Sequence, residues 1–171
     1  MQLKILKHPD TFLRQESQPI EEVKPDTQKL MDDMLETMYA ASGVGLAAIQ
    51  VGYQKRICVI DASASKNKPI FLVNPRIIQQ SDLTLTGEEG CLSVPGQFAE
   101  IDRPDKCHVK YLDYHGQAKE IRAEGMLATC IQHEMDHLEG ILFIDYLSKL
   151  KKTMIVKKLS KQKKALERIV V

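Results

Sequence analysis

Three residues in the segment 125–140 have the types and spacing of a metal site. His133 and His137 are four residues apart, so on a helix both imidazoles project from one face and can reach a single metal ion. Glu134 follows the first histidine directly, where its carboxylate can take a proton from a water activated by the metal without being a ligand itself. This spacing predicts a metal-dependent hydrolase.

The surrounding residues have the pattern of a helix. Met126, Cys130, Ile131 and Leu138 provide an apolar stripe, and Gly140 suits the left-handed position that ends a helix. Two histidines and a glutamate beside an apolar face fit poorly in a plain core, because unpaired buried polar groups are costly. Metal binding therefore explains them better than core packing does.

A catalytic metal site usually has three protein ligands, so a third ligand is required. Phe143 stands where metzincin proteases place a third histidine, and the only glutamate after Glu139 is Glu167, deep in a lysine-rich tail. The third ligand is therefore expected upstream. Cys91 is the best candidate, since the glycine before it, Gly90, lets the backbone approach a metal closely.

The other cysteines and histidines are weaker candidates for the third ligand. Cys58 and Cys107 lie in apolar, strand-like runs, where cysteine usually acts as a small hydrophobic residue. Cys130 lies three residues before His133 on the same helix and is not well aimed at the metal. The remaining histidines have no comparable context and are expected on the surface or in strands: His8, His108 and His115.

The glycine-rich stretch 43–50 meets the loose dinucleotide-binding pattern, with Gly43, Gly45 and Ala48 at the required spacing. That pattern requires a strand before it and a helix after it, whereas here a helix precedes and a strand is expected to follow. Dinucleotide binding is therefore rejected. A purely structural turn remains an alternative, but Gln50 at its end offers a neutral donor that suits the oxyanion of an acyl-transfer reaction.

Three stretches, in this order, resemble the motifs of the peptide deformylase family. They are Gly43–Gln50, Glu89–Ser93 and Gln132–Phe143, and the opening His8–Asp10 fits as well. The resemblance spans essentially the whole chain. It implies a metal-dependent amidase that removes the N-formyl group from the N-terminal formyl-methionine of newly made polypeptides and releases formate.

The resemblance also implies a role for each motif residue. The metal ligands would be Cys91, His133 and His137. Glu134 would transfer the proton, and the oxyanion would be stabilised by the Gln50 side chain and the Leu92 backbone N–H. The nascent chain would bind as an added β-strand near Val44, Gly45 and Gly90. Its first side chain would enter an apolar pocket formed by Val44, Met126, Thr129, Cys130 and His133.

The motifs alone do not determine the identity of the metal or the substrate preference beyond the first residue. Thiolate and imidazole ligands suit iron(II), zinc, nickel and cobalt alike; the resemblance implies iron(II) in the cell, with zinc, nickel or cobalt possible in purified protein. Phe98 occupies a position where many bacterial members carry an arginine close to the substrate. Substrate preference beyond the first residue is therefore expected to differ.

Composition favours a single catalytic domain over residues 1–171. Hydrophobic residues make up 43% of the 171 residues, with no apolar run of membrane-spanning length and no signal-peptide pattern at the N-terminus. Four cysteines without paired spacing point to a reducing, cytoplasmic setting. Because the net charge is only +1, we expect neither DNA nor a membrane as a partner.

The rest of the chain is expected to place strands between two helices. One helix begins at Pro25, which suits the first turn, and ends at Ser42–Gly43. Its regularly spaced apolar residues indicate core packing: Leu30, Met31, Met34, Leu35, Met38 and Tyr39. Strands are expected over 55–62, 69–79, 83–87, 105–113 and 117–123. This order predicts an α+β fold with mostly antiparallel sheets around the central metal-binding helix.

The stretch 148–171 is expected to form a basic C-terminal helix capped by Ser148. Its charged residues are Lys149, Lys151, Lys152, Lys157, Lys158, Lys161, Lys163, Lys164 and Arg168, against Glu167. Two interpretations remain open. The helix is a solvated face docked through Leu150, Met154, Ile155 and Leu159, or it contacts an anionic partner, which the resemblance suggests is ribosomal RNA.

Two other functional classes remain alternatives. A general zinc endopeptidase would cleave internal peptide bonds, and the missing downstream ligand argues against it. A non-catalytic, metal-stabilised binding module would close the metal site with a fourth protein ligand and would tolerate replacement of Glu134.

Overall fold

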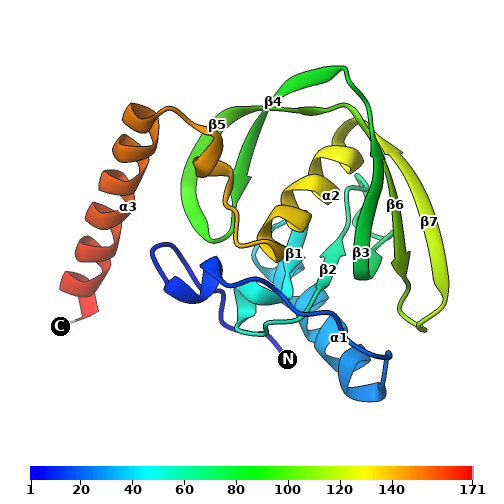
Figure 1. Ribbon diagram of the computed structural model, residues 1–171. Coiled ribbons are helices and arrows are strands. Elements are labelled where there is room, and N and C mark those ends of the chain that lie inside the picture. Colours follow the sequence, from blue (N-terminus) through cyan, green and yellow to red (C-terminus); the bar gives the residue numbers. More distant parts are fainter. Residues whose placement is uncertain (171) are drawn as a thin grey trace.

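Two antiparallel sheets lie around a central helix in the computed structural model, which describes residues 1–170 (Figure 1). The helices are α1 (Pro25–Ala40), α2 (Gly125–Leu138) and α3 (Lys149–Val170), with short 3-10 helices η1 (Thr11–Arg14), η2 (Ala48–Val51) and η3 (Phe143–Tyr146). The strands are β1 (Gly45–Ala47), β2 (Ile57–Ile60), β3 (Ile70–Gln80), β4 (Thr84–Cys91), β5 (Val94–Pro104), β6 (Lys106–Leu112) and β7 (Ala118–Glu124).

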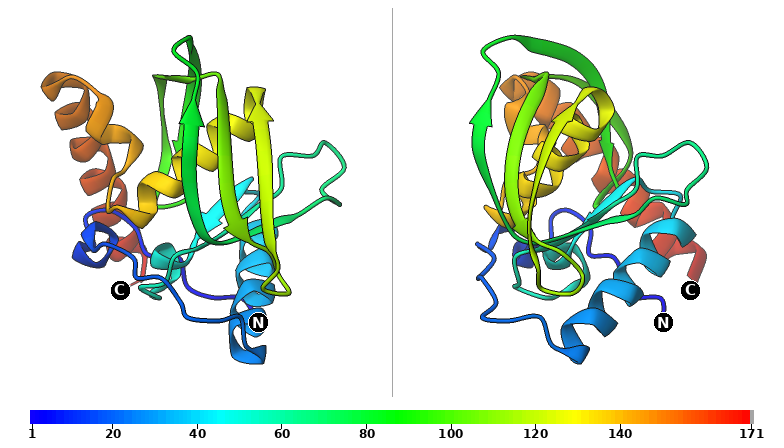
Figure 2. Two further views of the ribbon diagram at one scale, coloured as in Figure 1. Left: turned by 45° about the vertical axis from the view of Figure 1, so that its right-hand side comes forward. Right: turned by 90° about the vertical axis from the view of Figure 1, so that its right-hand side faces the viewer.

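The larger sheet has the strand order β1-β2-β3-β6-β7, and β4 pairs with β5 in a separate two-stranded sheet. All neighbouring strands in both sheets are antiparallel. The views in Figure 2 show the long strands curving past α2. The predicted α+β class, with antiparallel sheets around the helix that carries the histidines, is confirmed.

Strand β2 is buried on both faces, so a helix can pack on each side of it. Alternate residues of a strand point to opposite faces. Cys58 and Ile60 accordingly pack in the same core cluster as α2, whereas Ile57 and Val59 pack in the cluster that contains α1. The methionines predicted in the core of α1 are fully buried: Met31, Met34 and Met38.

The C-terminal end of α2 is fixed by a glycine. Gly140 has a positive φ of 72°, as predicted for the residue that ends this helix. A Cβ atom at Gly140 would lie 2.5 Å from the Arg14 backbone oxygen, and the Arg14 guanidinium donates to the Gly140 carbonyl at 3.1 Å. The segment around η1 therefore packs tightly against the end of the helix that carries His133 and His137.

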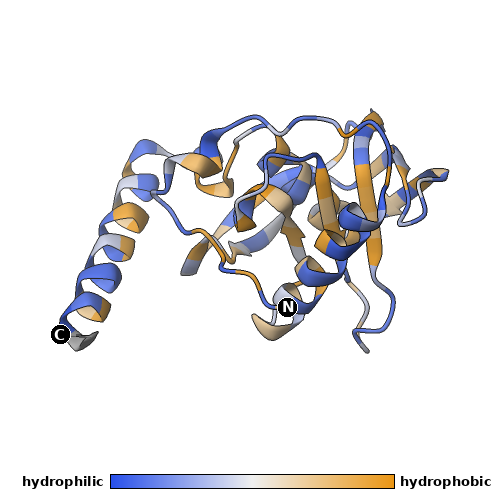
Figure 3. Ribbon diagram, turned by 90° about the horizontal axis from the view of Figure 1, so that it is seen from below, coloured by the Kyte–Doolittle hydropathy of each residue, from blue (hydrophilic) through white to orange (hydrophobic). Residues whose placement is uncertain are grey.

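Helix α3 is attached by a narrow apolar stripe. Ile155 and Leu159 are buried against residues of β5 and η3, whereas Leu150 and Met154, which were also expected to dock, are 72% and 51% exposed. Most of the rest of α3 is hydrophilic, as its colouring in Figure 3 shows. Within residues 1–170, no helix has both the length and the apolar content that a membrane crossing requires.

Three local expectations were wrong. Residues 94–104 form β5, which was not predicted because Pro95, Gly96 and Pro104 disguise the strand pattern; pairing with β4 determines the structure there. The glycine-rich stretch 43–50, for which no strand or helix was expected, contains the short strand β1 followed by η2. Met126 was placed on the apolar stripe of α2, but it lies in the first turn and is 60% exposed.

Replacing Gly140 with alanine is expected to destabilise the fold by roughly 2–5 kcal/mol, because left-handed strain adds to a collision with the Arg14 carbonyl. Gly52→Ala is a matched control, since Gly52 also has a positive φ, of 88°, but nothing lies within 4 Å of the place that its Cβ atom would occupy. That control should cost only about 1 kcal/mol. Urea unfolding at equal protein and metal concentrations measures both; equal losses would contradict the tight contact at Gly140.

Candidate metal centre

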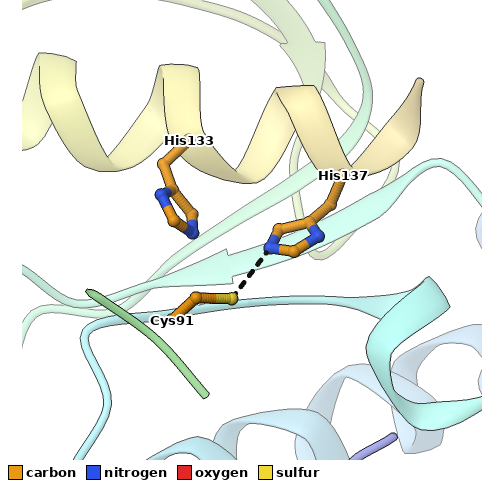
Figure 4. Close-up of side chains that lie close together, drawn as sticks. All are labelled: Cys91, His133 and His137. Atoms are coloured by element: carbon orange, nitrogen blue, oxygen red, sulfur yellow. Dashed lines mark hydrogen bonds between the residues drawn. The ribbon is translucent and has the colours of Figure 1, made fainter. Parts of the chain in front are cut away.

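Cys91, His133 and His137 converge on one point between β4 and α2. Their ligand atoms all lie within 4.8 Å of one another. Figure 4 shows the cysteine and both histidine rings turned toward a common space. The Cys91 sulfur is 3.4 Å from His137 Nε2. The structure thus brings together the three residues that were expected to bind a metal.

The local backbone explains this convergence. The two histidines are one helical turn apart on α2, and their ring centroids are 5.2 Å apart in an edge-on arrangement. Cys91 pairs with Val94, so Leu92 and Ser93 form the turn between β4 and β5. A shift in strand register between Gly90 and Cys91 accompanies this turn. The cysteine is therefore presented at the tip of a hairpin that faces the helix.

The donor set fits a divalent metal cation. One sulfur and two imidazole nitrogens are ligands that zinc, iron, nickel and cobalt accept. Burial, together with the positive charges of His133 and Arg103, lowers the pKa of His137 well below its usual value, so this ring is neutral and its nitrogen lone pair is available. Its Nδ1 atom is buried and has no hydrogen-bond partner within residues 1–170.

The surroundings of His133 favour positive charge. Burial alone would lower its pKa, but the Cys91 sulfur and the carboxylates of Glu89 and Glu134 raise it to about 10. A metal cation would satisfy the same negative groups while displacing the proton from the ring. The electrostatics of the centre therefore agree with its donor atoms in favouring a bound cation.

A carboxylate that was absent from the predicted site residues orients His133. Glu89 Oε1 lies 2.9 Å from His133 Nδ1, which leaves Nε2 for the metal side, as is usual for metal-binding histidines. Arg103 binds Glu89 through two bonds of 2.6 and 2.9 Å. Burial alone would raise the pKa of Glu89, but hydrogen bonds to His133 and Arg103 outweigh it and lower the pKa.

One sequence signal points to Glu89. It lies two residues before Cys91, so on a strand both side chains face the same side. Arg103, by contrast, gave no signal, because its partner comes from another strand. Arg103 also donates to Asp136 on α2 at 2.9 Å, which joins the hairpin to the helix.

Glu134 lies beside the three ligand candidates and is closely surrounded. Its side chain is 5% exposed, and burial raises its pKa to about 7. One carboxylate oxygen, Oε2, is buried and has no hydrogen-bond partner in the described part of the chain. A Cβ atom at Gly45 would lie 2.6 Å from the other oxygen, Oε1. Only glycine therefore allows β1 to lie this close to a carboxyl group that can exchange protons near neutral pH.

Gln50 is also next to the cluster. Its Nε2 is 3.6 Å from the Cys91 sulfur and donates to Ser93 Oγ at 3.0 Å. Its Oε1 accepts from the backbone N–H of Ala47 at 2.9 Å. Leu92 follows Cys91 directly in the hairpin turn. Of the two predicted oxyanion donors, Gln50 thus lies beside Cys91 in space and Leu92 lies next to it in the sequence.

The residues expected to bind substrate are distributed over three elements. Gly45 is buried on β1, Gly90 is half-buried on β4, and Val44 directly precedes β1 and is half-buried. On α2, Cys130 is buried and Thr129 is half-buried. Strand β1 is at the edge of its sheet, and β4 is paired only with β5 within the described residues. Each of these strands therefore has one edge with no strand partner among the described residues.

The other expected positions have ordinary structural roles. Cys58 and Cys107 are buried in the core, as predicted, and burial raises the pKa of both thiols. His8 lies outside the cluster and donates its backbone N–H to Ser93. His108 on β6 pairs with Glu120 on the edge strand β7.

Comparisons with known proteins agree on one family. A family model described as "Polypeptide deformylase" matches residues 2–153. A peptide deformylase of Pelagibacter ubique is 62% identical over 161 residues, covering 93% of this chain and 94% of the relative. One from Maricaulis maris is 55% identical over 166 residues, covering 96% and 95%.

Solved structures give the same result. A peptide deformylase from Legionella pneumophila has a TM-score of 0.94 and 46% identity, covering 98% of this chain and 99% of that one. An Ehrlichia chaffeensis peptide deformylase, solved in complex with actinonin, has a TM-score of 0.91 and 44% identity, covering 94% and 97%. The resemblance noted in the sequence is thereby confirmed, and this chain belongs to the peptide deformylase family.

Proposed function

We propose that this chain hydrolyses the N-terminal formyl amide of newly made polypeptides that begin with formyl-methionine, releasing formate and a free amino terminus. The observation that carries this function is the grouping of one cysteine and two histidines around a buried glutamate, with a glutamine amide beside them. Membership of the family supports the same reaction. The alternative function is a general endopeptidase, and the choice of substrates in the assay below distinguishes the two.

The metal would be held by Cys91, His133 and His137. When bound, a divalent cation supplies Lewis acidity, which polarises the formyl carbonyl and makes water more acidic. We propose iron(II) as the metal in the cell, with zinc, nickel or cobalt as replacements in purified protein, because the sulfur–nitrogen donor set accepts all four. Since iron(II) and a thiolate are both oxidisable, the iron form would lose activity in air.

Glu134 acts as the proton carrier. Its carboxylate accepts a proton from the attacking water as the new carbon–oxygen bond forms, and then delivers it to the departing amine nitrogen as the carbon–nitrogen bond breaks. The pKa of about 7 suits both directions of transfer near neutral pH. Its Oε2 atom, which has no protein partner among residues 1–170, provides an acceptor for the water proton.

Gln50 and Leu92 stabilise the charge that develops on the formyl oxygen. The Gln50 amide is held beside Cys91 by its bond to the Ala47 N–H, and Leu92 offers its backbone N–H from the adjacent hairpin turn. Donors fixed in advance are worth more than mobile ones, because they need no rearrangement during the reaction.

The substrate backbone binds as an extended strand at the edges of β1 and β4, close to Val44, Gly45 and Gly90. Free strand edges support this mode of peptide recognition. The methionine side chain enters a pocket formed with Thr129 and Cys130. Met126, which is 60% exposed in the first turn of α2, would contribute to the same pocket.

Phe98 gives the outer part of this site an apolar character. It pairs with Gly90 across the hairpin and is 63% exposed. We propose that substrate residues after the methionine meet an aromatic surface here, where the family resemblance implies an arginine in many bacterial members.

We also propose that residues 1–171 act as a single catalytic domain in the cytoplasm, with helix α3 contacting ribosomal RNA.

Two substitutions distinguish the role of a metal ligand from the role of the proton carrier. Cys91→Ala is expected to lose the metal, because one of three ligands is removed. Glu134→Gln should keep the metal but lower kcat by roughly 10²–10⁴-fold, since proton transfer fails while the ligands stay in place. The readouts are metal content per chain and formate release from formyl-Met dipeptides in anaerobically purified protein.

The same assay distinguishes the alternatives. Cleavage of unformylated internal peptide bonds at a comparable rate would support an endopeptidase instead. Full turnover by Glu134→Gln would exclude the role assigned to this residue. Retention of one tightly bound metal by the Cys91→Ala protein would contradict the proposal that Cys91 is a ligand.

The ribosome contact is tested by charge removal on α3. Deleting the helix would expose the core residues packed against Ile155 and Leu159, so a triple variant is preferable: Lys157→Gln, Lys161→Gln and Lys164→Gln. These three lysines are exposed. Binding to ribosomes in co-sedimentation at low salt should fall by about tenfold or more, and the salt dependence should become shallower by roughly two to three counterions.

The matched control removes the same charge elsewhere, with Lys4→Gln, Lys7→Gln and Lys119→Gln, which are also exposed. Formate release from free peptides should be unchanged in both triple variants. If the two variants bind ribosomes equally well, or both lose binding equally, α3 has no specific contact.

A further inference from the structure

We propose that Ser93 is a positioning residue that aims the side-chain amide of Gln50 at the reacting formyl group. Its hydroxyl accepts one of the two hydrogens on Gln50 Nε2, and this leaves the other hydrogen directed at the metal centre. The inference rests on the proposed function, because it concerns the donor that stabilises the oxyanion in that reaction.

The orientation of the Gln50 amide follows from its contacts. The backbone N–H of Ala47 can only donate, so the atom 2.9 Å away must be the amide oxygen, Oε1. The amide nitrogen therefore lies on the opposite side, 3.0 Å from Ser93 Oγ and 3.6 Å from the Cys91 sulfur. Each hydrogen on Nε2 thus has a separate direction, one toward Ser93 and one toward the cluster.

Without the Ser93 bond, the amide has fewer constraints on its plane. The last torsion of a glutamine side chain has broad energy minima. Without Ser93, only the bond at Oε1 and the long 3.6 Å contact from Nε2 to the Cys91 sulfur would restrain it. Bonds on both ends of the amide fix the plane. Gln50 is 1% exposed and Ser93 is fully buried, so no bulk water competes for the hydrogen that Ser93 accepts.

The backbones of both residues are fixed independently of the serine hydroxyl. The Leu6 N–H donates to the Gln50 carbonyl at 2.7 Å, and the His8 N–H donates to the Ser93 carbonyl at 2.8 Å. One short N-terminal segment therefore ties η2 to the β4–β5 turn. Because these bonds remain when the hydroxyl is removed, the change acts on the direction of the amide and not on the position of the loops.

The position of Ser93 links both proposed oxyanion donors. Leu92, whose backbone N–H would supply the second donor, precedes Ser93 in the same turn. The turn therefore supplies one donor from its backbone and orients the other through its side chain. Ser93 gains and loses no proton in this role, and it touches no reacting atom.

The test compares Ser93→Thr with Ser93→Val, two side chains of nearly equal shape that differ in the hydroxyl. Removing one oxyanion donor entirely costs roughly 10²–10³-fold in kcat, so misdirecting it should cost less. In metal-loaded protein, Ser93→Val is expected to lower kcat about 10- to 100-fold while KM and metal content stay within about twofold. Ser93→Thr should retain most of the rate, and in a Gln50→Ala background the two variants should have equal rates.

A second measurement needs no turnover. In ¹⁵N-labelled, metal-loaded protein, the Gln50 side-chain amide signals should shift and exchange with solvent faster in Ser93→Val than in Ser93→Thr. Equal rates and equal amide signals in the two variants would overturn the role of the hydroxyl. A rate gap that persists without Gln50 would show that Ser93 acts elsewhere. A wild-type protein that releases no formate would overturn the proposed function, whereas the amide signals would still decide the role of Ser93.

Discussion

A buried ion pair between Glu89 and Arg103 is the interaction on which the rest of the site depends. Both residues are about 5–6% exposed, and they belong to β4 and β5, the two strands of the hairpin that carries Cys91. Burying two charges costs several kcal/mol each unless their hydrogen bonds are satisfied. Here the Glu89 carboxylate is also hydrogen-bonded to His133 Nδ1, and the Arg103 guanidinium also donates to Asp136. The hairpin and α2 are therefore joined at the positions that carry the ligands.

This network continues beyond the metal centre. The Arg103 guanidinium lies 5.2 Å from the centre of the Tyr146 ring, and the Tyr146 hydroxyl donates to Asp136 at 2.8 Å. Short-range packing then brings the reactive groups close together. Gly45 allows β1 to lie against Glu134, and Gly140 allows η1 to lie against the end of α2. The chemistry thus depends on contacts between segments that are far apart in the sequence.

Local sequence patterns predicted the parts of the fold that local forces determine. Pro25, the methionine spacing of α1 and Gly140 were informative because capping, periodicity and left-handed backbone are properties of neighbouring residues. The histidine pair was informative for the same reason, since its spacing is a property of one helix. The absence of a downstream ligand pointed to Cys91, and the glycine-rich stretch pointed to Gln50. The family motifs agreed with both, and the structure places both beside the histidines.

Other features depend on pairing between distant segments, which no single stretch reveals. The strand Val94–Pro104 forms because β4 pairs with it, although its prolines and glycine argue against a strand. Arg103 was missed because its partners lie on β4 and α2. Ser93 was recognised only as part of a motif, because its bond to Gln50 crosses from one loop to another. Met126 followed the apolar pattern yet lies in an exposed first turn, where the sheet does not cover it.

The central claim is that one sulfur and two imidazole nitrogens bind the same metal ion. X-ray absorption at the metal edge of the loaded protein tests it most directly. We predict one sulfur at about 2.3 Å and two nitrogens at about 2.0–2.1 Å for a zinc-loaded sample, with the sulfur absent in Cys91→Ser. A spectrum of the unaltered protein with no sulfur bonded to the metal would contradict the account.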